Sequence, residues 1–191
     1  MIGSIVLHEL AHGWVAIACG DPTPRESGHM TLNPVVHMGW MSLVMFAIMG
    51  LAWGLMPTNP NRYRRERLGR VLVAAAGPAM NVALAIMALT AAGAWTWAVN
   101  TGRVAPAPHT ARNVDLFLWI GGSLNLMLAA FNLLPVVPLD GSRILAGASR
   151  TMDRFYAQPA VAAYGMLVVL VLFFGTLDAP LQRALQRRAD A

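Results

Sequence analysis

The chain has 191 residues, of which 57% are hydrophobic and 12% are charged. Ordinary soluble domains carry about 25% charged residues, so this composition excludes a water-soluble globule, and the wealth of apolar residues excludes a disordered chain. The 14 positive charges, all arginine, outnumber nine acidic residues and give a net charge of +5, while the single cysteine excludes an internal disulfide.

Long charge-free stretches divide the chain into candidate membrane segments. No Asp, Glu, Lys or Arg occurs in residues 27–61, 71–102, 116–139 or 155–177. Each stretch is long enough for a helix to cross the hydrocarbon core, which takes about 20 residues. The apolar runs are continuous and do not alternate, which favours helices over the strands of a membrane barrel. We therefore predict an all-α, polytopic membrane helical bundle.

Five hydrophobic segments are expected in chain order, near residues 1–20, 39–56, 71–99, 114–134 and 159–177. A short irregular linker at residues 21–38 separates the first two. The second segment is rich in Met and Gly, and it is either a full crossing or a re-entrant segment. We expect residues 1–177 to form a single transmembrane core and residues 178–191 to form a short tail that contains arginine.

The arginines predict the orientation of these segments. Five of them lie in the loop at residues 57–70, and the positive-inside tendency makes that loop cytoplasmic. If every segment crosses, the N-terminus and residues 141–157 are cytoplasmic as well. The tail, with three more arginines, then lies outside. This conflict implies that the second or the fifth segment does not cross fully.

The first segment carries the sequence His8-Glu9-Leu10-Ala11-His12. Residues four apart share one face of a helix, so both imidazoles can reach one metal ion, and Glu9 lies near enough to act on water there. Zinc suits this set because neutral imidazoles bind it and it activates water without redox chemistry. The alternative interpretation is a buried polar trio that only joins helices together.

A catalytic zinc ion needs a third protein ligand. Glu26, His29 and His37 lie in the linker and are expected to be interfacial polar residues, although His37 retains a possible role near the metal. Asp140 is the better candidate. It follows two prolines that unwind the end of the fourth segment, and irregular backbone at membrane depth requires surrounding protein or a wet cavity. The alternative for Asp140 is an ordinary proline turn with a surface carboxylate.

Depth in the membrane and two asparagines complete the candidate site. With a cytoplasmic N-terminus, the two histidines and Asp140 fall on the same leaflet. Asn81 lies in the third segment, in Gly77-Pro78-Ala79-Met80-Asn81, where the small residues allow close helix packing. Asn81 or Asn132 could donate a hydrogen bond to a developing oxyanion. Each of these two residues could equally well form a hydrogen bond between helices.

Together these motifs resemble the signatures of the site-2 protease family, the intramembrane zinc metalloproteases of peptidase family M50. Residues 8–12, 77–81 and 132–141 match its three signatures in order. Residues 28–34 and 57–60 resemble a bacterial branch of the family, here without PDZ or CBS modules. Two features depart from the family pattern: few residues precede the first motif, and Met-Gly follows His37 where relatives often have Asp-Pro.

The resemblance implies one zinc ion per chain, held by His8, His12 and Asp140, with Glu9 as the general base and Asn132 as a group that orients the substrate or stabilises the oxyanion. It implies an endopeptidase for regulated intramembrane proteolysis, acting on transmembrane protein substrates in the lipid bilayer and not on nucleic acid. The expected location is the bacterial cytoplasmic membrane, with the active site toward the cytoplasmic side. The alternative function is a non-proteolytic metal-binding membrane protein, such as a divalent metal permease or sensor.

Overall fold

The computed structural model describes residues 1–171, in which every regular element is a helix. In chain order they are α1 (Ile2–Ala18), α2 (Thr23–Glu26), α3 (Pro34–Met49), the 3-10 helix η1 (Pro60–Arg62), α4 (Glu66–Asn100), α5 (Pro108–Asn132), α6 (Asp140–Ala148), α7 (Arg150–Tyr156) and a last helix, Pro159–Val171. The prediction of an all-α membrane bundle is confirmed. The end of the predicted fifth segment and the whole predicted tail lie outside the described residues.

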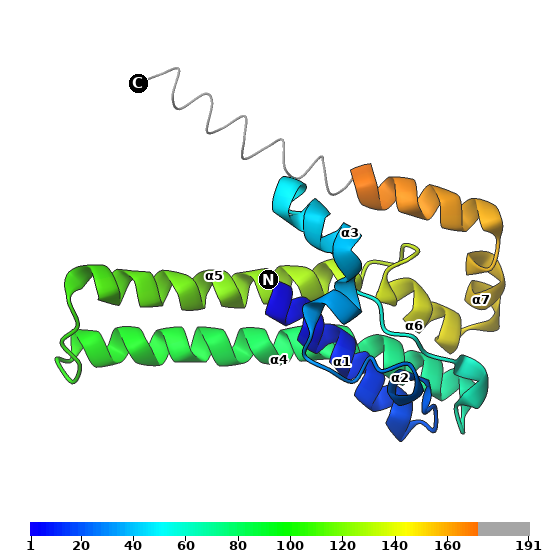
Figure 1. Cartoon of the computed structure of the whole chain (residues 1–191), viewed down its shortest axis with the longest axis horizontal. Coiled ribbons are helices and arrows are strands. Elements are labelled where there is room, and N and C mark those ends of the chain that lie inside the picture. Colours follow the sequence, from blue (N-terminus) through cyan, green and yellow to red (C-terminus); the bar gives the residue numbers. More distant parts are fainter. Residues whose placement is uncertain (172–191) are drawn as a thin grey trace, which may run out of the picture.

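The two longest helices, α4 and α5, form an antiparallel pair that extends well beyond the other helices (Figure 1). Both are long and apolar enough to cross a membrane, whereas α7 and the last helix meet that criterion only when taken together across a bend of 77°. Small residues allow the pair to pack closely. Ala85 is fully buried, and a Cβ atom at Gly122 would lie 2.6 Å from the side chain of Leu89. The third and fourth predicted segments therefore correspond to the two helices that are each long and apolar enough to cross a membrane.

Helix α1 packs antiparallel to the first half of α4. His12 of α1 donates a hydrogen bond to the carbonyl of Val73, and His8 lies beside Gly77, one turn further along α4. The C-terminal end of α1 meets the arginine loop, where the amide of Arg64 donates to the carbonyl of Cys19. The N-terminus thus points away from the arginine loop along α4. The sequence placed both on the same side on the condition that every segment crosses the membrane, whereas here they lie at opposite ends of α1.

The second segment turns back on itself. Helix α3 kinks at Gly39, whose φ of 66° is in the left-handed region that favours glycine. The straight part after the kink, residues 40–49, is only about 15 Å long, half the hydrocarbon thickness. Residues 51–59 then return without regular structure, and the hydroxyl of Ser42 exchanges hydrogen bonds with the backbone of Trp53. Of the two alternatives for this segment, the structure shows the re-entrant one.

Candidate metal centre

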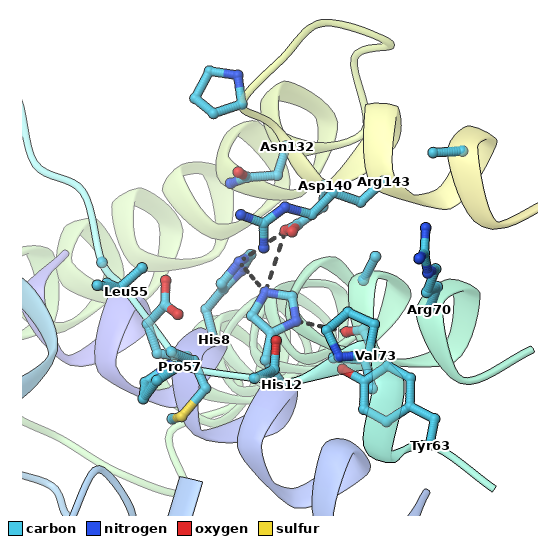
Figure 2. A pocket seen from close by; sticks show the side chains of 18 residues that line it. His8, His12, Leu55, Pro57, Tyr63, Arg70, Val73, Asn132, Asp140 and Arg143 are labelled. Carbon is cyan, nitrogen blue, oxygen red and sulfur yellow. Dashed lines mark hydrogen bonds and ion pairs between the residues drawn. The ribbon is translucent and has the colours of Figure 1, made fainter. Parts of the chain in front are cut away.

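Two histidines of α1 and the first residue of α6 converge beside α4 (Figure 2). Asp140 Oδ2 lies 3.1 Å from His8 Nε2 and 3.3 Å from His12 Nε2, and the two Nε2 atoms are 3.0 Å apart. All three side chains are buried. Within residues 1–171, they form the one group of His, Cys, Asp and Glu side chains close enough together to hold a metal ion.

The chemistry of these three groups fits a bound cation. His12 Nδ1 donates to the carbonyl oxygen of Val73 at 2.6 Å, so its Nε2 carries a lone pair. That lone pair points at a carboxylate oxygen of Asp140 and at the second imidazole, an arrangement that a cation between them stabilises. Two ligand atoms bound tetrahedrally to zinc at about 2.1 Å lie about 3.4 Å from each other, close to the separations observed here.

Helix α4 supplies the floor of the site through a glycine. A Cβ atom at Gly77 would lie 2.5 Å from His8 Cε1 and still closer to the Nε2 atoms of both histidines. Any side chain at this position would therefore occupy the point where the imidazoles converge. The sequence indicated that Gly77 allows close helix packing, and the structure shows that the face of α1 with His8 and His12 packs there.

Asp140 reaches the site because the chain turns sharply between α5 and α6. Helix α5 ends at Asn132, and residues 133–139 form the turn that the two prolines predict. Gly141 packs against the first carbonyls of this turn, where a Cβ atom would collide with the carbonyl oxygen of Leu133. The hydroxyl of Tyr156 donates to the carbonyl of Pro135 at 3.0 Å and ties α7 to the same turn. Asp140 is 6% exposed, so it is not the surface carboxylate of the alternative interpretation.

Glu9 is buried beside the three converging residues, with 8% of its surface exposed. The returning segment, residues 51–59, passes directly over it: a Cβ atom at Gly54 would lie 2.5 Å from Glu9 Cγ. The amide of Leu55 donates to the carbonyl of His37 at 2.8 Å and holds this segment against α3. The re-entrant segment thus covers the carboxylate predicted to act on water.

A cavity of about 550 Å³ joins these groups (Figure 2). Glu9, the three converging residues and Asn132 all line it. Asn132 Nδ2 donates to the carbonyl of Leu128 at 2.9 Å, and the side chain reaches the cavity wall near Asp140. Asn81 does not line the cavity. It is 1% exposed, and neither of its amide atoms has a hydrogen-bond partner among the described residues.

The other candidate ligands lie outside the group of three. Glu26 forms an ion pair with Arg62, and His29 Nδ1 donates to the carbonyl of Ser27 at 2.9 Å. His37 Nε2 donates to the carbonyl of Thr31 at 2.6 Å. His37 is 1% exposed, and its backbone carbonyl supports the segment over Glu9.

The cavity is also lined by four residues that the sequence did not single out for the site: Thr58, Tyr63, Arg70 and Arg143. Arg143 lies three residues after Asp140 on α6, so the helical period could have identified it as a neighbour. Tyr63 follows η1, outside the membrane-crossing helices. Burial raises the pKa of its phenol. No local pattern places Tyr63 or Thr58 in the cavity, since only the return of the re-entrant segment brings them there.

The family model for peptidase family M50 matches residues 1–103 and 97–176, which together include every residue that the structure describes. The chain belongs to peptidase family M50. The predicted family, the zinc metalloprotease class and the zinc cofactor are thereby confirmed, and the apolar helices fit an integral membrane protein.

Three relatives indicate how much of the family architecture the chain contains. "Putative zinc metalloprotease YwhC" of Bacillus subtilis is 36% identical over 91% of this chain and 77% of the relative. "Putative zinc metalloprotease Rip2" of Mycobacterium tuberculosis is 27% identical over 89% of this chain and 63% of the relative. For "Putative zinc metalloprotease Rip3" of the same species these values are 30%, 90% and 36%. The chain thus spans less than two thirds of the two mycobacterial relatives. No solved structure matches the chain significantly.

Proposed function

We propose that this M50 protein is an intramembrane endopeptidase that hydrolyses peptide bonds in or beside transmembrane segments of other membrane proteins, as in regulated intramembrane proteolysis. One observation carries the proposal: four side chains suited to hydrolysis are buried together, and three of them belong to the apolar helix α1. His8, Glu9, His12 and Asp140 are each 6–8% exposed, yet all line one cavity beside the membrane-crossing α4. A site in this position favours substrates that are themselves in the membrane.

His8, His12 and Asp140 are the proposed zinc ligands. When bound, zinc acts as a Lewis acid that polarises the substrate carbonyl and lowers the pKa of water to about 7. The protein prepares the ligands for this role. The carbonyl of Val73 fixes the ring of His12, and the absent side chain at Gly77 leaves room at the point of convergence.

Glu9 is the proposed general base and acid. Its carboxylate is buried but lines the cavity, so it reaches a water molecule there while the returning segment shields it. A carboxylate oxygen of Glu9 takes a proton from the attacking water and later transfers it to the amine nitrogen of the departing peptide. Glu9 ends the cycle ionised, as it began, and one water molecule is consumed for each bond cleaved.

Asn132 is the proposed group for orienting the substrate. One amide hydrogen is used by the carbonyl of Leu128, and the second remains for a substrate carbonyl in the cavity. Asn81 lies off the cavity and is not positioned for this task. A substrate helix must unwind locally before it can bind here, since each carbonyl in a helix is hydrogen-bonded and shielded by its own backbone.

The arginines support a site that faces the cytoplasmic side of a bacterial membrane. The cavity includes Tyr63 and Arg70, and therefore lies at the end of α4 that begins in the arginine-rich loop. The positive-inside tendency assigns that end to the cytoplasm. The site is then accessible to cytoplasmic water while its substrate enters from the lipid.

The test is cleavage of a model transmembrane substrate by the purified chain in lipid vesicles, with zinc content measured in parallel. Glu9→Gln should lower the cleavage rate by about 100-fold or more, the range for a lost general base, and should keep one zinc per chain. Asp140→Ala should lose both zinc and cleavage. Glu26→Gln makes the same chemical change at an exposed ion pair and should have no effect. Undiminished cleavage by Glu9→Gln would reject the proposed base.

A further inference from the structure

A second cavity, of about 300 Å³, lies between the start of α4 and the helices α6 and α7, outside the metal centre. Its charged lining consists of Glu66, Arg67, Arg70, Arg150, Asp153 and Arg154. Four arginines against two carboxylates give this lining a net charge of +2. Helices α4 and α6 pack tightly beside it: a Cβ atom at Gly147 of α6 would lie 2.8 Å from the side chain of Val71 on α4.

Both carboxylates in this cavity are already paired with one arginine. Arg70 donates to Asp153 Oδ1 at 3.1 Å and to Glu66 Oε1 at 2.8 Å. Within residues 1–171, no carboxylate lies within 4.0 Å of the other three guanidinium groups, those of Arg67, Arg150 and Arg154. Three positive charges around a small volume repel one another until an anion joins them. Phosphate oxygens match the planar hydrogen-bond donors of several guanidinium groups at once.

The position of the cavity along α4 indicates where the phosphate comes from. Residues 71–100 of α4 carry no charge, so its apolar stretch begins directly after Arg70. The axis of α7 is turned by 77° from that of the last helix, and Phe155 of α7 is 46% exposed beside Arg154. Figure 1 shows α7 and the start of α4 at the same end of the molecule. This is where phospholipid headgroups meet a crossing helix, and the arginine-rich side faces the anionic leaflet.

We propose that this cavity binds the phosphate of an anionic phospholipid, with Arg67, Arg150 and Arg154 around the headgroup. Arg70 and Ala146 line this cavity and also the cavity of the metal centre, so the lipid phosphate would lie next to the site of hydrolysis. The site is a binding site in its own right, and it does not depend on the proposed proteolytic activity.

The experiment uses the whole chain, purified in a neutral detergent and titrated with short-chain phosphatidylglycerol, phosphatidylcholine or inorganic phosphate. Native mass spectrometry counts the bound molecules and gives apparent affinities. We expect one tightly bound phosphatidylglycerol and at least a tenfold loss of affinity in the double variant Arg67→Gln/Arg154→Gln. Arg25→Gln/Arg65→Gln is the matched control. It removes two positive charges from exposed arginines outside the cavity and should keep the affinity within twofold.

Three results would overturn the proposal. If both double variants lose the same affinity for phosphatidylglycerol, the lipid is attracted by surface charge in general and not by this cavity. If phosphatidylglycerol binds no more tightly than phosphatidylcholine, the cavity does not recognise the anionic headgroup. If inorganic phosphate binds as tightly as phosphatidylglycerol, the cavity is a site for a soluble anion. The single change Arg150→Gln, at another exposed side chain, repeats the test if the double variant fails to fold. None of these measurements requires zinc or a substrate, so they remain decisive even if proteolysis is not observed.

Discussion

Gly77 illustrates how one residue determines the geometry of the metal centre. Glycine inside a helix costs about 1 kcal/mol relative to alanine, so helix propensity alone favours its replacement. Gly77 nevertheless lies in the middle of α4, at the closest approach of both imidazoles. The lower helix propensity of glycine is therefore offset by the packing that Gly77 allows, in which His8 and His12 of α1 lie directly against α4.

We predict that Gly77→Ala weakens zinc binding by at least tenfold, because the new methyl group displaces both histidine rings. Gly93→Ala is the matched control in the same helix, since a Cβ atom there meets nothing within 4 Å. It should keep full zinc affinity and gain a few tenths to about 1 kcal/mol of stability. Zinc titration with a competing chelator measures the first effect, and thermal unfolding measures the second. Equal zinc affinities in the two variants would contradict the proposed packing.

At the scale of elements, the re-entrant segment places a wall of the cavity beside Glu9 over α1. Its returning part, residues 51–59, has little regular structure and depends on side chains for its position. Ser42 bonds both backbone groups of Trp53, and the fully buried carboxylate of Asp21 accepts from the amide of Asn59 at 2.6 Å. Asp21 also accepts from Thr23 at the start of α2, so one carboxylate joins α2 to the end of the returning segment.

We predict that Asp21→Ala destabilises the protein by about 1–3 kcal/mol, since it removes a fully buried carboxylate and leaves the partly buried amides of Asn59 and Thr23 without their acceptor. Loosening of residues 51–59 should also speed proteolytic nicking within that segment. Asp115→Ala removes an exposed hydrogen bond from Thr96 on α4 and should change stability by less than about 0.5 kcal/mol. Thermal unfolding in detergent and limited proteolysis measure both variants. A segment that stays protected in Asp21→Ala would show that other contacts suffice to hold it.

For the whole molecule, the metal centre joins parts of the chain that are distant in sequence. His8 and Asp140 are 132 residues apart, and they meet only because α1 and α6 both pack on α4. An ion held between them binds the folded chain and not the unfolded one. Zinc at 100 times its dissociation constant would stabilise the fold by about 2.7 kcal/mol.

We predict that a strong chelator lowers the thermal unfolding midpoint and that added zinc restores it. In His12→Ala the midpoint should be lower from the start and insensitive to both treatments, because the ion has lost a ligand. Differential scanning measurements in one detergent, with and without zinc, make the comparison. A wild-type midpoint that is the same with and without zinc would argue against a metal that bridges α1 and α6.

Much of this protein follows from local sequence. Continuous apolar runs predicted α4 and α5, because the length of a crossing helix depends only on the thickness of the bilayer. The spacing of His8 and His12 put both on one helix face, and the prolines before Asp140 predicted the turn that ends α5. The family could also be predicted from local sequence, because its signatures are short motifs in a fixed order.

The tertiary structure alone decided the course of the second segment and the direction of the N-terminus. Hydropathy records that residues 39–56 are apolar, but a crossing and a re-entrant hairpin have the same hydropathy. The kink at Gly39 and the hydrogen bonds of Ser42 make the difference, and the second of these links residues 11 positions apart. The presence of Tyr63, Arg70 and Arg143 in the cavity likewise depends on which helices pack together. Contacts between distant segments produce no periodic pattern in the sequence, because the two partners become neighbours only when the chain folds.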